Sequence, residues 1–232
     1  MFSKLGFFRF VGDYEHPIDA LKAALTSHGD VERSLIVLPE GFNIRKPYRS
    51  QVRCNYDPGI LCDLQNLSTC NAVTFVAGLI IKERHGPRLP YNSAYLIDGE
   101  SSTRLCTKGT FDDGSSLYKP WAMDVEKLAI RAGSAIAAVI CRDIQDSQRF
   151  QTIVRRLATA DAAQKVLCVP ACMSHHFSGE VMMRYLGPNQ FLILANSDYF
   201  GCPSIVGKDG TVLAKTEAAD GNRVVLRNLV HS

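Results

Sequence analysis

The stretch AAVICRDIQD, Ala137–Asp146, joins an apolar run to a charged pair. Small or apolar residues fill Ala135–Cys141, which is the length and composition of a buried strand. Cys141 ends this run, and Arg142 and Asp143 follow it directly. The cysteine has two interpretations. It is either a core thiol, since unpaired cysteine behaves as a small hydrophobe, or a nucleophile held at the carboxyl edge of a sheet, where the sites of open α/β folds gather.

The composition is typical of a globular protein with a core of useful size. Of the 232 residues, 46% are hydrophobic and 21% are charged. The formal net charge of +3 is too small, and the basic residues are too scattered, to indicate nucleic-acid binding. Arg45, Lys46 and Arg49 form the one tight basic group, which fits a solvated loop. No segment approaches the roughly 20 apolar residues of a membrane-spanning helix.

Eight cysteines raise the question of disulfides or zinc. Secreted disulfide scaffolds are shorter and denser in cysteine, and Met1–Val11 lacks the features of a signal peptide. We therefore expect a cytoplasmic chain with reduced thiols. Two groups of residues resemble metal ligands but lack paired C-x-x-C spacing, so we expect no metal. These groups are Cys168, Cys172, His175 and His176, and Cys54, Cys62 and Cys70.

The chain has no repeat or Pro/Gly-rich linker and is expected to form a single domain over 1–232. The predicted helices are Pro17–His28, Leu61–Cys70, Gln148–Ala163 and Val181–Leu186. The predicted strands are Leu5–Val11, Ser34–Leu38, Val73–Ile81, Tyr91–Ile97, Thr103–Thr107, Ala135–Cys141, Val166–Val169, Phe191–Ala195, Ser204–Val206, Val212–Lys215 and Arg223–Leu229. This order favours a layered α/β fold with long sheets over a purely parallel one. No glycine-rich phosphate-binding loop is present, so we expect no cofactor.

Three reactive residues each stand where an apolar strand ends. Glu40 follows IVLP, Lys108 follows TRLCT, and Cys141 follows AIAAVI. Each has an ordinary explanation alone: a loop carboxylate, a surface lysine and a core thiol. A rigid sheet edge is also where a fold positions catalytic side chains.

The motifs around these residues resemble the nitrilase superfamily of carbon–nitrogen hydrolases. They occur in the family's order over nearly the whole chain: LIVLPEG, YNSAYLIDGE, CTKG, VICRD, VLCVPACMS, FLILANSDYFG and SIVGKDGTVLA. The resemblance implies a four-layer αββα sandwich of the nitrilase type and a Glu-Lys-Cys triad. It also implies a homodimer and a small amide or nitrile substrate.

The resemblance assigns a role to each member of the triad. Cys141 is the nucleophile, Glu40 the general base and acid, and Lys108 the electrostatic partner. A free thiol is mostly protonated at neutral pH, so a nearby base or ammonium raises its nucleophilicity. Charge that develops on the substrate oxygen needs fixed donors, which Lys108 and the backbone N–H of Arg142 would supply.

Substrate contacts are less constrained by the sequence. Arg142 stands where the family often has an aromatic residue; it either pairs with a substrate carboxylate or forms a structural ion pair with Asp143 or another acid. His175 and His176 either border the substrate or lie in an exposed loop. Tyr118 is expected to line the pocket.

Other family positions differ or have a structural explanation. The family's second glutamate is missing, and Asp112, Asp113 and Ser116 lie near its place. Asp143 is expected to hold the turn after the nucleophile. The side chains of Asn92 and Asn196 are most simply explained as buried amides that satisfy backbone groups.

The resemblance implies an amidase or carbamoyl hydrolase that releases ammonia or an amine. A nitrilase or an amide-forming acyl transferase would use the same nucleophile. A catalytically silent family member that acts as a binding or scaffold protein is the alternative outside enzymes.

Overall fold

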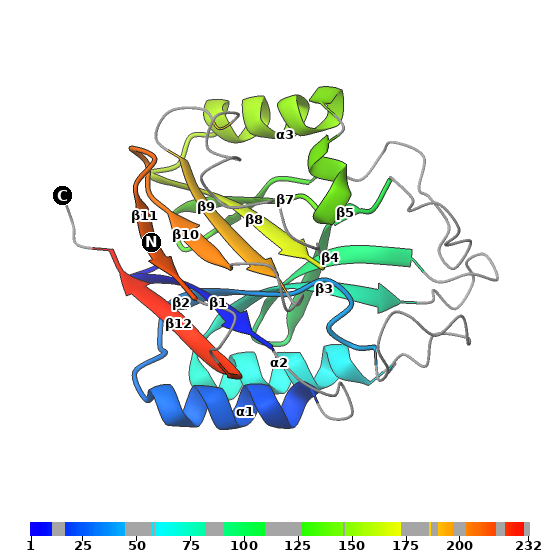
Figure 1. Ribbon diagram of the computed structural model, residues 1–232, viewed down its shortest axis with the longest axis vertical. Helices are drawn as coiled ribbons and strands as arrows, with labels where there is room; N and C mark the ends of the chain where they lie inside the picture. Colours follow the sequence, from blue (N-terminus) through cyan, green and yellow to red (C-terminus); the bar gives the residue numbers. More distant parts are fainter. Residues whose placement is uncertain are drawn as a thin grey trace.

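The computed structural model of the chain describes residues 1–10, 17–44, 57, 59–81, 91–109, 127–145, 147–172, 186, 190–196, 203–216 and 221–229. Within these residues, two six-stranded sheets pack face to face, and helices cover their outer faces (Figure 1). The layers follow the order α, β, β, α, so the predicted four-layer sandwich is confirmed.

The first sheet combines a parallel centre with antiparallel edges. Its strands, in spatial order, are β12 (Arg223–Asn228), β1 (Lys4–Arg9), β2 (Ser34–Leu38), β3 (Thr74–Ile81), β4 (Tyr91–Asp98) and β5 (Ser101–Thr107). Strands β1, β2 and β3 are parallel. Helices α1 (Pro17–His28) and α2 (Ile60–Asn71) cover the outer face, where Leu21 and Leu64 join a core with Ile36 and Phe75.

The second sheet has the same plan. Its strands are β11 (Val212–Lys215), β10 (Ser204–Val206), β9 (Gln190–Asn196), β8 (Gln164–Ala171), β7 (Ser134–Ala138) and β6 (Ala129–Arg131). Strands β7, β8 and β9 are parallel. Helix α3 (Ser147–Thr159) covers the outer face, because Phe150, Ile153 and Leu157 recur at helical spacing and pack against the sheet.

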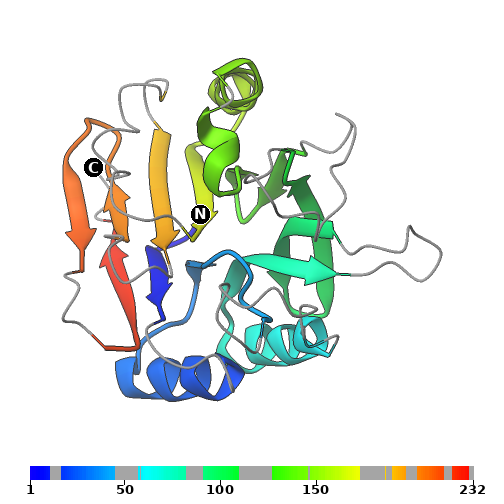
Figure 2. The same cartoon turned by 45° about the vertical axis from the view of Figure 1, so that its right-hand side comes forward.

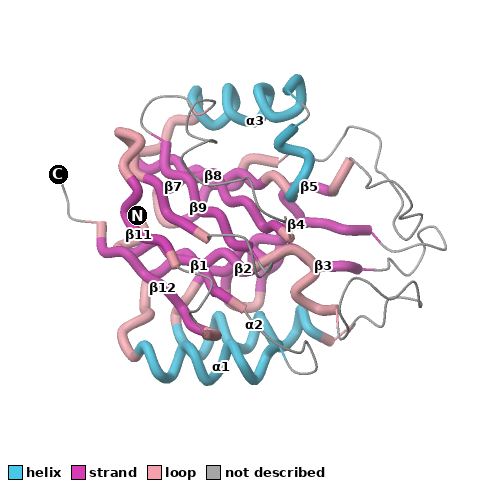
Figure 3. The backbone as a smooth tube through the Cα atoms, in the orientation of Figure 1, coloured by secondary structure: helices cyan, strands magenta, loops and turns pink. Residues whose placement is uncertain are grey.

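The inner faces of the two sheets share one apolar core, which includes Val37, Val76, Cys168 and Ile193. The strands lie between the helices in Figures 2 and 3. The carboxyl ends of the two parallel trios lie at one edge of the sandwich, where the backbone N–H of Glu40 after β2 donates to the carbonyl of Ala171 in β8 (3.4 Å). The reactive residues identified in the sequence follow strands that end at this edge.

Two predicted elements differ from the structure, and one short strand was not predicted. Strand β7 ends at Ala138, because Cys141 adopts a positive φ of 47° and starts a short 3₁₀ helix, η1 (Cys141–Gln145). Helix α3 ends at Thr159 rather than Ala163, since β8 already pairs with β7 from Gln164 and the residues between must connect them. The three-residue strand β6 was not predicted because it is too short to show a period.

The remaining predicted elements are confirmed to within a few residues, apart from the helix Val181–Leu186, which lies outside the described residues except for Leu186. Cys168 is fully buried in β8, as expected for a core thiol. Every cysteine that the structure describes is a free thiol. Among the described helices, none has the length and apolar character needed to cross a bilayer.

The close approach of the two sheets at this edge depends on Gly78 in β3. A Cβ there would lie 2.8 Å from the Cα of Glu40 and 2.9 Å from the Cβ of Pro170. We expect Gly78→Ala to lower the free energy of unfolding by about 1–3 kcal/mol, the typical effect of overpacking. Urea denaturation measures this change.

The matched control is Gly221→Ala, because a Cβ at Gly221 meets nothing within 4 Å. We expect the control to keep the stability of the wild type. Equal stability of the Gly78→Ala and Gly221→Ala proteins would contradict this account of the edge.

Candidate active site

Glu40 lies in the tight turn that follows β2. The side-chain amide of the buried residue Asn43 ties this turn to β3: its Nδ2 donates to the carbonyl of Ile80 (2.7 Å) and its Oδ1 accepts from the N–H of Ile80 (2.8 Å). The N–H of Phe42 also donates to the carbonyl of Gly78 (3.0 Å). The turn is therefore fixed to the sheet, and it presents a Glu40 side chain that is only 1% exposed.

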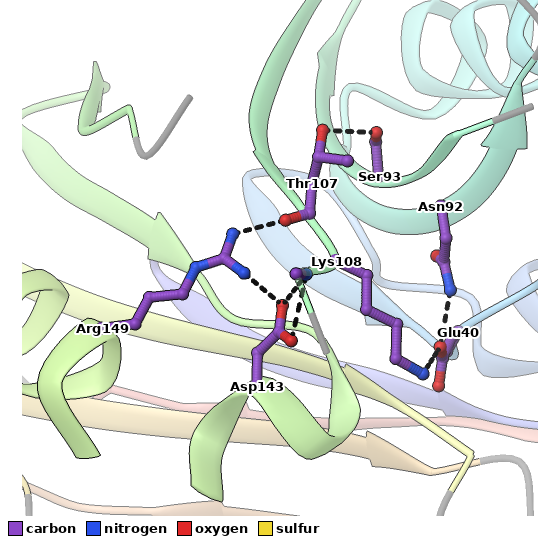
Figure 4. Close-up of polar contacts among 8 residues, drawn as sticks. Glu40, Asn92, Ser93, Thr107, Lys108, Asp143 and Arg149 are labelled. Carbon is purple, nitrogen blue, oxygen red and sulfur yellow. Dashed lines mark hydrogen bonds and ion pairs between the residues drawn. The ribbon is translucent and has the colours of Figure 1, made fainter. Parts of the chain in front are cut away.

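Two donors converge on one oxygen of that carboxylate (Figure 4). Lys108 Nζ, from the residue after β5, lies 2.7 Å from Glu40 Oε1, and Asn92 Nδ2, from the start of β4, lies 2.6 Å from the same atom. The backbone N–H of Lys108 also donates to the carbonyl of Asn92 (2.8 Å), so the two strands hold both donors in register. Because Oε1 accepts from an ammonium and an amide, the second oxygen, Oε2, is better suited to accept a proton.

Cys141 stands where β7 turns into η1. Its positive φ is unusual for a residue other than glycine, and such backbone strain is concentrated at functional sites. The same strand-to-helix turn lifts the nucleophile above the sheet in α/β hydrolases. The side chain is 3% exposed, and Sγ lies 3.8 Å from the carbonyl oxygen of Cys172, the residue after β8.

The surroundings of Cys141 favour the neutral thiol. Burial raises the pKa of the thiol well above its usual value, and the negative charge of Glu40 and a hydrogen bond with its carboxylate raise it further. The positive charge of Lys108 and a hydrogen bond with the backbone of Cys172 act in the opposite direction and lower the pKa. The resting thiol therefore keeps its proton beside a carboxylate that can accept it. The sequence-based interpretation of Cys141 as a simple core thiol does not account for these two charged neighbours.

Asp143 takes the structural role that the sequence predicted for it. Its carboxylate accepts from the backbone N–H of Gly109 with both oxygens, at 3.1 and 2.9 Å, and pairs with Arg149 Nη1 at 2.9 Å. The Asp143 side chain is 2% exposed. The carboxylate thus links η1, which begins at Cys141, to the residue after Lys108.

The structure brings together Glu40, Lys108 and Cys141, and it adds two residues that the sequence reasoning missed. The interpretation of Asn92 as an amide that satisfies backbone groups is wrong for its Nδ2, which donates to Glu40 instead. The position of Asn92, at the start of a strand on the reactive edge, was the available signal. The sequence did not indicate a role for Arg149, because its partners Asp143 and Thr107 belong to other secondary-structure elements.

The other predicted contacts cannot be placed on this site. The side chain of Arg142, together with His175, His176 and Tyr118, lies outside the described residues. So do Asp112, Asp113 and Ser116, the residues near the place of the family's second glutamate.

Comparisons with known proteins identify the fold. Solved structures of an amidase from Nesterenkonia sp. AN1 match the chain. A cysteine-to-alanine variant of this amidase, from the nitrilase superfamily, has a TM-score of 0.74 at 16% identity over 98% of this chain and 90% of that chain. A glutamate-to-glutamine variant, in which acrylamide has added to the active-site cysteine, has a TM-score of 0.71 at 15% identity over 98% and 93%. No family model and no curated protein sequence matches the chain. The chain therefore has the fold of the nitrilase superfamily, as predicted.

The opposite effects of Glu40 and Lys108 on the thiol give a direct test of the site. Glu40→Gln removes a negative charge that raises the pKa of Cys141, so alkylation of Cys141 by iodoacetamide should extend to lower pH. Lys108→Met removes a positive charge that lowers this pKa, so alkylation should require higher pH. Peptide mass spectrometry across a pH series measures both shifts.

The exposed thiols Cys62 and Cys70 serve as internal controls in the same samples. Their alkylation profiles should be identical in all three proteins. Shifts of Cys141 in the same direction in both variants would contradict the arrangement of charges described above.

Proposed function

We propose that the chain is a carbon–nitrogen hydrolase that cleaves a small amide or carbamoyl compound through a thioester on Cys141. The observation that carries the proposal is the convergence of a buried carboxylate, an ammonium and a thiol, drawn from Glu40, Lys108 and Cys141. Nucleophilic catalysis by a thiol requires a base within hydrogen-bonding reach and a positive charge near the developing oxyanion.

The first half of the reaction forms the acyl-enzyme. Cys141 Sγ attacks the carbonyl carbon while Glu40 takes the thiol proton, which offsets the raised pKa of the thiol. Lys108 Nζ stabilises the oxygen that gains negative charge, and the backbone N–H of Arg142 is proposed as the second donor. Glu40 then gives its proton to the nitrogen of the leaving group. The C–N bond breaks, and ammonia or an amine departs from a Cys141 thioester.

The second half releases the acid. Glu40 takes a proton from a water molecule, and the resulting hydroxide adds to the thioester carbon. The C–S bond breaks, and the Cys141 sulfur leaves with the proton that Glu40 returns. Atoms and charges balance, and the enzyme is restored without a cofactor. Asn92 takes part by keeping Oε1 occupied, which keeps Oε2 as the oxygen that carries the proton.

The similar solved structures guide the choice of test compounds. A cysteine-to-alanine variant of the Nesterenkonia amidase holds butyramide, and another variant carries the acetamide moiety of fluoroacetamide on its active-site cysteine. Small aliphatic amides are therefore the first substrates to assay, followed by carbamoyl compounds and nitriles. The homodimer and the cytoplasmic location stay predictions.

Ammonia release from this panel of compounds tests the proposal. We expect turnover of at least one amide by the wild type and none by Cys141→Ala. Glu40→Gln should lower kcat by about 10²–10⁴-fold, the range for loss of a general acid–base group. Cys62→Ala, which removes an exposed thiol, should keep wild-type kcat.

Other outcomes point to the alternatives. Ammonia release from nitriles alone would indicate a nitrilase, and acyl transfer to added amines a transferase. A wild type that is alkylated at Cys141 but turns over nothing would support a silent binding protein. Full activity in Cys141→Ala would overturn the mechanism.

A further inference from the structure

Arg149, in the first turn of α3, reaches across to the end of β5. Its Nη1 donates to Asp143 Oδ2 (2.9 Å), and its Nη2 donates to the backbone carbonyl of Thr107 (Figure 4). Charge-assisted hydrogen bonds of this kind are roughly twice as strong as neutral ones. One guanidinium therefore joins η1, which begins at Cys141, to β5, which leads directly into Lys108.

The partners of Arg149 enclose Lys108 on both sides. Thr107 precedes Lys108, and its carbonyl accepts from Arg149; Gly109 follows Lys108, and its N–H donates to both oxygens of Asp143. The hydroxyl of Thr107 also contacts the hydroxyl of Ser93 at 2.8 Å. Hydrogen bonds thus fix the backbone of Lys108 immediately before and after its own Cα.

Gly109 fits this arrangement because it has no side chain. A Cβ at this position would collide with the guanidinium group of Arg149. The guanidinium group of Arg149 therefore lies in the space that a side chain at position 109 would occupy. This close packing restricts the position of the neighbouring Lys108 backbone, from which the Lys108 side chain extends. We call Asp143, Arg149 and Gly109 the lysine clamp.

The clamp also ties Lys108 to the nucleophile. Asp143 lies two residues after Cys141 in η1, and α3 follows directly. A shift of Arg149 would therefore change the spacing between the lysine and the thiol rather than the position of either alone. Asp143 is buried, so loss of Arg149 would leave its charge without this ion pair and disturb the segment further.

We propose that Arg149 is a positioning residue, which acts through Asp143 and the backbone of Thr107 and Gly109 to hold Lys108 against Glu40 and Cys141. The consequence for turnover rests on the proposed function. The consequence for the thiol does not, because the charge of Lys108 acts on Cys141 whether or not an amide is hydrolysed.

The alternative is that Arg149 only fastens α3 to the sandwich. A fastening role would lower stability in Arg149→Ala and leave the titration of Cys141 unchanged in the folded protein. The positioning role predicts that Lys108 lowers the pKa of the Cys141 thiol by less in Arg149→Ala than in the wild type. The pH profile of alkylation therefore separates the two roles.

The experiment compares Arg149→Ala, Arg149→Lys and Arg155→Ala, each confirmed as folded by circular dichroism. Arg155 lies on the same helix and is exposed, so it controls for loss of positive charge on α3. In Arg149→Ala, alkylation of Cys141 by iodoacetamide should shift to higher pH, toward the profile of Lys108→Met. Arg149→Lys should shift by less, since lysine keeps the charge but lacks the forked donors. Arg155→Ala should match the wild type.

Kinetics on any amide that the wild type hydrolyses provide the second measurement. Arg149→Ala should lower kcat by on the order of 10²-fold with KM nearly unchanged, because small misplacements of catalytic groups reduce the rate this much. If Arg149→Ala does not fold, the alkylation profiles and kcat values of Arg149→Lys and Arg155→Ala are compared instead.

A folded Arg149→Ala protein with the wild-type alkylation profile would overturn the inference. The proposed function would stand in that case if amides are still hydrolysed. Conversely, a wild type without amide turnover would remove the proposed function, while a shifted profile in Arg149→Ala would still support the lysine clamp.

Discussion

The ion pair between Glu40 and Lys108 is the interaction on which the rest of the site depends. Their charged atoms lie 2.7 Å apart, and their side chains are 1% and 11% exposed. Removing two charges from water costs several kcal/mol per ion, which the pair offsets only with good geometry and additional hydrogen bonds. Asn92 supplies one such bond to Glu40. The ion pair therefore requires a frame that holds β2, β4 and β5 in a fixed arrangement.

The fold supplies this frame at one edge of the sandwich. Gly78 lets the Glu40 turn approach β3 and β8, and Asn43 fastens the turn to Ile80. Across the edge, the strained backbone of Cys141 starts η1, and Asp143 connects η1 to Gly109. The contacts that position the reactive side chains thus come from both sheets, which explains why the site needs both. The hydrogen bonds that stabilise this edge of the sandwich therefore also position the reactive side chains.

Much of this arrangement could be predicted from the sequence, because strands and their ends are local patterns. Apolar runs marked β2 and β7, and the residues that follow them were recognised as reactive for that reason. The contacts between these strands, in contrast, join residues that lie far apart in the sequence. Asn92 lies 52 residues from Glu40, and Arg149 lies 42 residues from Thr107, so no spacing rule links either pair. The early end of β7 was also missed, since a positive φ at cysteine has no sequence signature.

The central claim is that Cys141 carries the acyl group during turnover, and acid-quenched intact-mass spectrometry tests it most directly. The wild type is mixed with a small amide that it hydrolyses and is quenched during turnover. The account predicts a mass increase equal to the acyl group, located on Cys141 by peptide mapping and missing in Cys141→Ala. Steady ammonia release with no adduct on Cys141, or with the adduct on another residue, would contradict it.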